Sequence, residues 1–520
     1  MFKNLLHEAP DWRRDPKAAI TVFLVALPLC LGIALASGVP MLSGILAGLV
    51  GALIVAPLSG SQLSVSGPAA GLTVIVLDAQ QSLGTFESFL LAVLLAGVVQ
   101  LILGFVKAGL IAFYFPSAVI KGMLAGIGLM LFFKQLPHAV GYDLIAMGDE
   151  DFVDAGTQNT FSELALAFSR FSPGAIVVST ISLALLLLWD LPRMKNSKLA
   201  QNLPAGVVVV LISIGLDSLF QVTLPAWALS ADHKVNLPAF LSGQDPLLLT
   251  HPDFSQIVNP KVWQAAFTIG IVASIETLLS TEAADKLDPW KRLTPPNREL
   301  KAQGIGNMMS GLIGGLPITS VIVRSSVNIQ AGAKTKWSSF LHGVYLLILV
   351  LLIPNLLNRI PLAALAAILL MVGYKLASPS LFKNTYRAGL NQFLPFLATV
   401  IAVVFTDLLI GIGLGLVVSV FFILRNNFQH QYQIKKEFAD TCYRYVITLS
   451  PAVSFLNKGS LLAMLEAIPH DSEVEIDGRK TKHIDYDIRE VITNYYLQCK
   501  GRNQPITLYH IELTEASNHH

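Results

Sequence analysis

The chain has 520 residues, of which 53% are hydrophobic and only 13% are charged, with a mean hydropathy of +0.61 and a formal net charge of +2. A soluble domain carries about 25% charged residues, so this composition excludes an ordinary soluble protein. The near-neutral charge, without a basic patch interleaved with aromatic residues, gives no support to nucleic-acid binding. Cys30, Cys442 and Cys499 are far apart and predict neither a disulfide framework nor a zinc site.

Apolar segments recur along the chain, and most are long enough, at roughly 17 or more residues, to cross about 30 Å of hydrocarbon. They predict a polytopic α-helical membrane protein with about fourteen spans, arranged as two groups of about seven. The first group covers roughly 18–36, 41–58, 68–82, 88–106, 114–134, 173–190 and 204–221. The second covers roughly 262–284, 299–314, 318–330, 337–353, 361–374, 391–406 and 408–425.

These spans define the expected domain organisation. A cytoplasmic N-terminal segment, 1–17, precedes a transport domain, 18–425, whose repeats cover about 18–222 and 262–425. The first span lacks a small-residue cleavage site and is followed at once by another, so it is interpreted as a helix that stays in the protein and not as a signal peptide.

The third span of each group is short and follows a segment rich in glycine, proline and serine. These two preceding segments are Ser64–Gly71 and Gly314–Ser320. The second is followed by the polar residues Arg324, Ser325 and Asn328. Interrupted helices at matching positions of two halves are typical of inverted-repeat transporters and of their binding sites. An arginine inside a span is a functional-site hypothesis by default.

The distribution of charge predicts the orientation. With the N-terminus inside, the inner loops hold most of the basic residues, whereas the outer loops hold many acidic ones. The inner examples are Lys286, Lys291, Arg292, Arg298 and Lys301, and the outer examples are Asp149, Glu150, Asp151 and Asp154. By the positive-inside rule both termini are cytoplasmic. Lys121, early in the fifth span, lies near the inner surface, where its ammonium can reach the headgroups.

The tail after Arg425 changes in composition. Strands are predicted at 443–449, 472–476 and 506–511, and helices at 458–468 and 486–499. Alternating strands and helices predict a small cytoplasmic α/β domain over 426–520.

Three segments of the predicted spans form recognisable blocks: Leu63–Ala70, Pro116–Gly126, and the block that runs from Asn297 to Asn307 and continues through Arg324 to Thr335. These segments resemble the SulP family of inorganic anion transporters, the bacterial relatives of solute carrier family 26. The first is similar to the family's helix 3 signature and the second to its helix 5, and the third is the most specific. The tail resembles a diverged STAS domain through Val453–Phe455 and Ile484–Asp485.

The resemblance implies fourteen helices in inverted repeats, with helices 1–4 and 8–11 in a core domain and 5–7 and 12–14 in a gate domain. It also implies transport of an inorganic or small organic anion by an elevator-like shift of core against gate. The family covers sulfate, bicarbonate, chloride and dicarboxylates, so membership alone does not choose the substrate.

The expected anion site lies where two half-helices begin, because their free amide groups and partial positive charge attract anions. The candidate substrate-binding residues at the two helix starts are Ser66, Gly67, Pro68, Ala69 and Ala70, and Thr319, Ser320, Val321, Ile322 and Val323. Arg324 would add a permanent positive charge. Helix-packing glycines and caps are the alternative interpretation of these residues.

Glu276 and Ser280, four residues apart within the eighth span, are the candidate coupling residues. A carboxylate there is costly unless it is paired, protonated or bound to an ion. In a sodium-coupled bicarbonate branch of the family, such a pair binds sodium with the helix 10 backbone and a threonine. Ser320 and Ile322 match the helix 10 part, but Ile322 replaces the threonine. Sodium binding, protonation of Glu276 and an ion pair with Arg324 therefore remain alternatives.

Four other polar residues are not expected to take part in the anion site. Asp217 and Asp407 lie near helix ends, where interfacial solvation accounts for them. His138 and His342 are interpreted as packing or interfacial residues.

These features together predict a secondary active anion transporter of a bacterial inner membrane, with bicarbonate as the first substrate and sulfate as the second, coupled to sodium or protons. An anion exchanger, an anion channel for chloride or bicarbonate, and a dicarboxylate transporter are the alternatives on the same fold. No nucleophile, metal cluster or phosphate loop suggests an enzyme. The expected partners are the anion, the lipid bilayer and a second copy of the chain, with no cofactor other than the candidate sodium ion.

Overall fold

The computed structural model describes residues 14–143, 160–195, 203–237, 250–429, 432–439 and 442–514. Most of the predicted N-terminal segment and the acidic residues Asp149, Glu150, Asp151 and Asp154 lie outside these ranges. The chain divides into two compact units, Met1–Leu416 and Val417–His520. The division falls inside helix α20 (Leu408–Gln429), a few residues before the boundary expected from composition.

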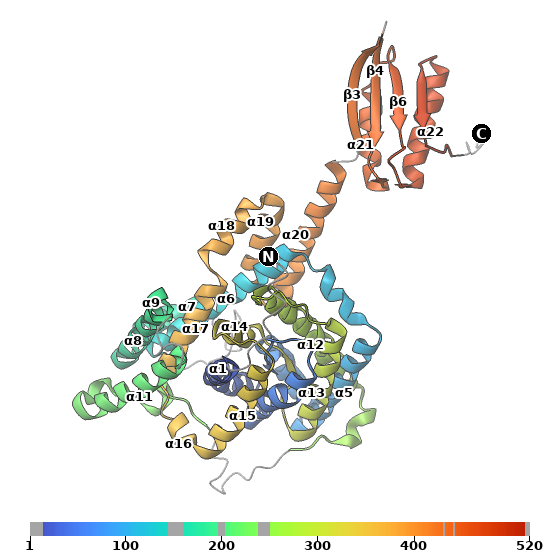
Figure 1. The fold of residues 1–520 in the computed structure, drawn as a ribbon. Helices are drawn as coiled ribbons and strands as arrows, with labels where there is room; N and C mark the ends of the chain where they lie inside the picture. Colours follow the sequence, from blue (N-terminus) through green and yellow to red (C-terminus); the bar gives the residue numbers. More distant parts are fainter. Residues whose placement is uncertain are drawn as a thin grey trace. The chain divides into compact units, whose positions relative to one another are not determined.

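Helices occupy all the predicted spans (Figure 1). In the first group these are α1 (Asp15–Ala36), the continuous run α2, η3 and α3 (Met41–Val50, Gly51–Val55 and Ala56–Leu58), α4 (Thr73–Leu83), α5 (Phe86–Phe105), α6 (Ser117–Val140), α8 (Pro173–Asp190) and α11 (Ala205–Thr223). In the second group they are α12 (Pro260–Leu287), α13 (Pro296–Ile313), α14 (Ile322–Gln330), α15 (Trp337–Leu352), α17 (Leu362–Leu376), α19 (Leu390–Phe405) and α20. Shorter elements between them include η5 (Ala108–Tyr114), α7 (Thr160–Ser169), α9 (Pro192–Lys195), η7 (Ala231–His233), α16 (Pro354–Leu357) and α18 (Pro379–Arg387).

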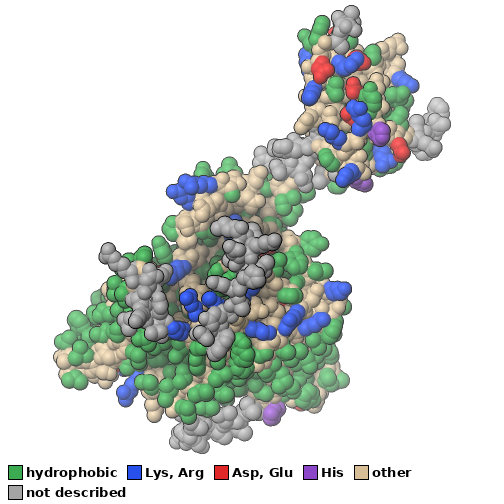
Figure 2. Space-filling model, in the orientation of Figure 1, with side chains coloured by type: hydrophobic (Ala, Val, Ile, Leu, Met, Phe, Trp, Pro, Cys, Tyr) green, Lys and Arg blue, Asp and Glu red, His purple; other side chains and the backbone are tan. Residues whose placement is uncertain are grey.

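The first unit is a multi-pass membrane domain. Among the described residues, 8 helices are long and apolar enough to cross a membrane. Many large apolar side chains of this unit are exposed, as in α11 and the shorter apolar helix α19. Figure 2 shows hydrophobic side chains over much of the visible face of this unit. Such a surface is stable against lipid and not against water, which confirms the predicted class.

The helices of this unit pack as two groups. In the first, which we call the core group, α5 lies against α4, α12 and α13, and α1 lies against α2, α14 and α15. In the second, which we call the gate group, α6 lies against α17 and α19, and α8 lies against α11 and α17. The axes come close where glycines meet: a Cβ added at Gly128 of α6 would lie 2.7 Å from the carbonyl oxygen of Gly373 in α17. The grouping agrees with the expected division into core and gate domains.

The two short helices begin later than predicted. Ser66–Pro68 forms strand β1 and Ile318–Ser320 forms strand β2, and the two pair antiparallel with Ser66 opposite Ser320. A 3-10 turn at Ala70–Leu72 then leads into α4, and Val321 precedes the first residue of α14. The expectation that Ser66, Gly67 and Pro68, or Thr319 and Ser320, form the first helical turns is therefore wrong. Strand pairing is favoured because these segments need partners for their backbone groups inside the membrane.

The second unit is a small α/β domain. Its sheet has the strand order β3 (Tyr432–Ala439), β4 (Cys442–Leu449), β6 (Glu473–Asp477) and β8 (Ile506–Tyr509), with β3 antiparallel to β4 and the other neighbours parallel. Helices α21 (Lys458–Glu466) and α22 (Tyr486–Gly501) connect the parallel strands, and β5 (Ala452–Val453) pairs with β7 (His483–Ile484). The core contains Ile447, Leu465, Ile476 and Ile492, so the predicted α/β class is confirmed.

Strand β3 is an element that the sequence pattern does not predict. Residues 433–438 are all exposed, including the apolar side chains of Ile434 and Phe438. An edge strand that buries neither face lacks the alternation by which strands are recognised. Lys435 and Lys436 place positive charges on this edge strand, and such charges commonly prevent an edge strand from pairing with other chains.

A buried polar cluster joins α6 to the loop after α11. Nδ1 of His138 and Nδ1 of His233 lie 2.6 Å from the two carboxylate oxygens of Asp143. Asp217 is also buried, pairs with Lys234 at 2.8 Å and accepts the amide of Leu229 at 3.0 Å. Protein partners, and not interfacial water, therefore satisfy Asp217 and His138. His342 is buried completely, as expected for a packing residue.

The Asp143 cluster makes stability depend on pH. Burial by itself would raise the pKa of Asp143, but hydrogen bonds from His138 and His233 hold it below its ordinary value. The hydrogen bond to Asp143 raises the pKa of His233. Because the folded state favours protonated His233, its interaction with Asp143 stabilises the protein fully below the unfolded-state histidine pKa of about 6.5. This contribution is lost as the pH rises through the folded-state pKa of His233.

We expect His233→Gln to destabilise the protein by roughly 1–3 kcal/mol near pH 6, because glutamine can donate to Asp143 but carries no charge. The difference from wild type should shrink as the pH rises through the raised folded-state pKa of His233, above which its imidazole is neutral as well. The apparent melting temperature of the solubilised protein, measured across this range, checks the effect. His251→Gln, which changes an exposed histidine, is the matched control. A His233→Gln difference that stays constant with pH would contradict the charge argument.

Candidate functional site

The paired strands β1 and β2 fix where the two half-helices start. Besides the register of Ser66 with Ser320, the amide of Val321 donates to the carbonyl oxygen of Val65 at 2.9 Å. The hydroxyls of Ser64 and Ser320 are hydrogen-bonded to each other. The starts of α4 and α14 are thereby held beside one another although they are about 250 residues apart in the chain.

Side chains from neighbouring helices bind the remaining backbone groups of these segments. Asn307 of α13 receives the amide of Ile318 at 2.5 Å and donates to its carbonyl oxygen at 2.9 Å. Asn328 donates to the carbonyl oxygen of Leu63 at 2.9 Å, and Ser339 to that of Ser64 at 2.8 Å. The polar residues of the segment 297–335 thus serve largely to satisfy non-helical backbone within the membrane domain.

A cavity of about 60 Å³, which we call the small cavity, lies at the two helix starts. The core group contributes Ala70, Gly71, Glu276, Ser280, Val321, Ile322 and Val323 to its lining. The gate side contributes Ile127 and Met130 of α6, Val403 of α19, and Asp407, Leu408 and Leu409 at the start of α20. The small cavity is therefore bounded by both packing groups.

Glu276 and Ser280 meet at this cavity as their spacing on α12 predicts. Their side chains are buried, with relative exposures of 6% and 2%. A Cβ added at Gly71 would lie 3.3 Å from Oε1 of Glu276, so the absence of a side chain there leaves the carboxylate beside the start of α4. Carboxylate and hydroxyl oxygens, together with backbone carbonyls, are the ligands that hard cations prefer.

Arg324 lies away from the lining of the small cavity. Its side chain is fully buried, and its Nη2 donates to the carbonyl oxygen of Pro68 at 3.4 Å. Among the described residues, its Nε and Nη1 have no geometrically defined hydrogen-bond partner, although the thiol of Cys30 lies near the guanidinium, which also lies against Gly67. The charge of Arg324 acts on the site from behind the strand pair and not by direct contact with the cavity.

The predicted site residues therefore fall into two layers. Ala70, Val321, Ile322, Val323, Glu276 and Ser280 line the small cavity. Ser66, Gly67, Pro68, Ala69, Thr319, Ser320 and Arg324 do not belong to its lining and support it. Within the supporting layer, Ser66 accepts from Gln303 at 2.6 Å, and the amide of Ser320 donates to Thr277 at 3.3 Å.

Asp407 is a cavity residue that the sequence interpretation assigned to interfacial solvation. Its carboxylate accepts the amide of Ile410 at 2.8 Å, so it also caps the start of α20. A carboxylate in the short link between two apolar spans is the signal that could have singled it out. The described residues that line the small cavity include two carboxylates, Glu276 and Asp407, and no basic side chain.

Comparison with known proteins gives a consistent result. Residues 13–402 match the family described as the sulfate permease family. The chain is 28% identical over 417 residues to the putative sulfate transporter YvdB of Bacillus subtilis, covering 80% of this chain and 74% of that protein. It is also 28% identical over 421 residues to the bicarbonate transporter BicA of Picosynechococcus sp., covering 78% of this chain and 69% of that protein.

Solved structures share the fold. The transmembrane domain of a cyanobacterial bicarbonate transporter, BicA, superposes with a TM-score of 0.55 at 25% identity, covering 77% of this chain and 97% of that chain. Murine Slc26a9 in its inward-facing state superposes with a TM-score of 0.66 at 15% identity, covering 97% of this chain and 86% of that chain. The second likeness concerns the fold alone.

The contact between Gly67 and Arg324 yields a stability prediction. A Cβ added at Gly67 would lie 2.1 Å from Nη1 of Arg324, and the guanidinium is enclosed on all sides. We expect Gly67→Ala to destabilise the protein by roughly 1–3 kcal/mol, as overpacking does. Gly215→Ala is the control, because nothing lies within 4 Å of a Cβ at that position in α11. Equal melting temperatures for Gly67→Ala and Gly215→Ala would show that Arg324 is free to move.

Proposed function

The chain belongs to the sulfate permease family of anion transporters, and on this basis we propose that it is a secondary active transporter of a small inorganic anion, with bicarbonate as the first substrate and sulfate as the second. Relatives named as sulfate and as bicarbonate transporters support both substrates. The protein acts by moving its substrate and not by converting it.

The observation that carries this proposal is the small cavity at the converging starts of α4 and α14. Free amide groups at two helix starts supply partial positive charge without a buried cation in the cavity itself. The buried Arg324 adds a full positive charge behind the strand pair. These sources favour an anion between the helix starts.

The size of the small cavity favours an inorganic substrate. Its volume is about 60 Å³, whereas one water molecule needs about 10–15 Å³ by a comparable measure. A planar or tetrahedral oxyanion with little water fits this space. A dicarboxylate is disfavoured because its length would require the cavity to widen.

The charge of the lining favours coupled transport. An anion next to Glu276 and Asp407, which both line the small cavity, is repelled while the two carboxylates are ionised. A sodium ion on the oxygens of Glu276 and Ser280, or a proton on Glu276, would remove this repulsion. The side chain of Ile322 offers no oxygen to sodium, so a proton remains the alternative coupling ion.

The two walls of the small cavity favour an elevator-type mechanism. The anion-facing helix starts, Glu276 and Ser280 all belong to the core group, whereas Ile127, Val403 and Leu408 belong to the gate side. A shift of the core group along the gate group would carry the whole binding layer from one membrane face to the other. We place the protein in a bacterial inner membrane with both termini cytoplasmic, as a homodimer with the tail as a STAS-like scaffold.

Proteoliposome uptake tests the substrate and the coupling together. Labelled bicarbonate and sulfate are supplied separately, with and without an inward sodium gradient and with and without a proton gradient. We expect uptake of at least one anion to rise with one of the two gradients. Uptake of neither anion would contradict the proposed substrates, and unitary currents without coupling would favour a channel.

Glu276→Gln tests the coupling residue. We expect coupled uptake to fall about tenfold or more, because the amide neither binds a cation with a full charge nor accepts a proton. Asp78→Asn, which changes an exposed carboxylate on α4, is the control and should leave uptake unchanged. Gradient dependence that survives in Glu276→Gln would assign this residue a structural role only.

A further inference from the structure

Three basic side chains form a row at the end of the membrane domain where α13 begins, and we call Arg298, Lys301 and Lys336 the basic row. Arg298 and Lys301 are three residues apart on α13, so they occupy one face of this helix. The exposed Ile305 continues that face four residues further on. Lys336 is the residue before α15.

Hydrogen bonds hold Arg298 and Lys336 next to each other. Nε of Arg298 donates to the carbonyl oxygen of Leu58 at 3.0 Å, and Nζ of Lys336 donates to that of Pro57 at 2.7 Å. Pro57 and Leu58 are consecutive residues at the end of α3, and consecutive Cα atoms are about 3.8 Å apart. Helix α3 also packs against both α13 and α15. The two cations are therefore neighbours in fixed positions.

The charges of Arg298 and Lys336 act on one another. Burial lowers the pKa of Lys336, and the nearby charge of Arg298 lowers it further, whereas the charge of Glu299 opposes this shift. Two like charges held this close repel each other, and a negative charge beside them would offset the repulsion.

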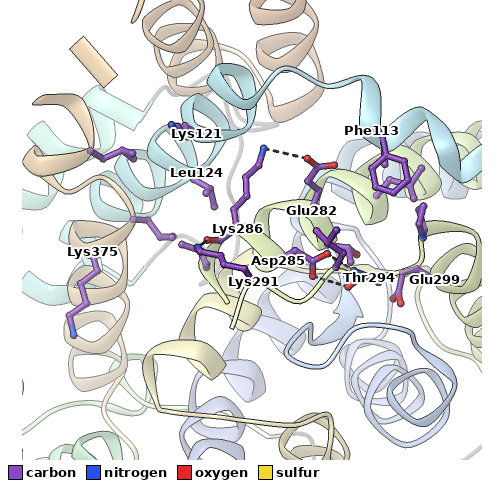
Figure 3. Close-up of a pocket in the computed structure, with 18 of the residues that line it drawn as sticks. Phe113, Lys121, Leu124, Glu282, Asp285, Lys286, Lys291, Thr294, Glu299 and Lys375 are labelled. Carbon is purple, nitrogen blue, oxygen red and sulfur yellow. Dashed lines mark hydrogen bonds and ion pairs between the residues drawn. The ribbon is translucent and has the colours of Figure 1, made fainter. Parts of the chain in front are cut away.

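Glu299, the carboxylate next to Arg298 in the chain, faces away from the basic row. It is fully buried and accepts hydrogen bonds from Ser59, Gly60 and Gln303. It lines a cavity of about 600 Å³ (Figure 3), and the described lining of that cavity does not include the basic row. Within the described ranges, no carboxylate forms an ion pair with a member of the row. The row therefore presents an excess of positive charge to its surroundings.

Exposed apolar side chains flank the basic row. Nζ of Lys301 lies 4.3 Å from the ring centroid of Phe105, which is exposed at the end of α5, as is Ile102 one turn earlier. Trp337, which follows Lys336, is exposed as well. Aromatic rings of this kind are enriched where hydrocarbon meets lipid headgroups. Figure 2 shows Lys and Arg side chains along the border of the hydrophobic face of this unit.

We propose that the basic row binds the phosphate of an anionic phospholipid, whose acyl chains lie against the exposed apolar side chains of α5 and α13. The excess positive charge selects an anionic headgroup, because a zwitterionic lipid brings a cation that the row repels. A free phosphate ion would match the charge but would leave the apolar side chains without a partner. The site lies on helices of the core group and does not depend on the proposed transport function.

Native mass spectrometry of the full-length protein in detergent tests this proposal, with phosphatidylglycerol or phosphatidylcholine of the same acyl chains added at equal concentration. We expect the protein to retain phosphatidylglycerol preferentially, and this binding to weaken about tenfold or more in the triple variant Arg298→Gln, Lys301→Gln, Lys336→Gln. The matched control changes three exposed basic side chains elsewhere and should bind like wild type: Lys261→Gln, Lys383→Gln, Arg387→Gln.

A second variant separates charge from folding. Arg298→Lys, Lys301→Arg, Lys336→Arg keeps all three charges and should retain phosphatidylglycerol, and melting temperatures show whether each variant is folded. Equal retention of the two lipids, or undiminished binding by the glutamine triple variant, would overturn the proposal. Displacement of phosphatidylglycerol by inorganic phosphate would identify the free ion as the ligand instead. Dimers that exclude the lipid, when monomers bind it, would assign this face to a second copy of the chain.

Discussion

The structure depends on one constraint, which is that backbone groups inside a membrane must find partners in the protein. Two helices are interrupted in the middle of the core group, and an interruption leaves amides and carbonyls without helical partners. The antiparallel pair of Ser66–Pro68 with Ile318–Ser320 satisfies them for both segments at once. Because the register places Ser66 opposite Ser320, the two following helices start side by side. The pairing that satisfies the backbone therefore also creates the cavity.

The side chains around the strand pair follow from the same constraint. Asn307 binds both backbone groups of Ile318, and Asn328 and Ser339 bind carbonyls of the other segment. Many polar residues of the segment 297–335 are thus structural, although they lie around the small cavity. Arg324 is the exception, since two of its nitrogens have no hydrogen-bond partner among the described residues while its side chain is fully buried. Its positive charge, only partly satisfied, favours a negative charge nearby.

The small cavity combines negative side chains with positive potential from the backbone. It is lined by the carboxylates of Glu276 and Asp407, and it lies at the starts of two helices, whose amide groups carry partial positive charge. Both packing groups bound it, so the relative movement that the proposed elevator-type mechanism requires would change its lining.

The sequence by itself determined the class of protein, the positions of the spans and the two interrupted segments, because length, hydropathy and glycine–proline punctuation are local properties. It also placed Glu276 and Ser280 on one face of a helix, since that follows from helical spacing. Only the tertiary structure decided that Ser66–Pro68 and Ile318–Ser320 are strands, because their hydrogen-bond partners lie about 250 residues away in the chain. It also placed Arg324 behind the cavity and Asp407 in its wall, and it joined His138 and His233 through Asp143. These are non-local contacts, which no local pattern of residues encodes.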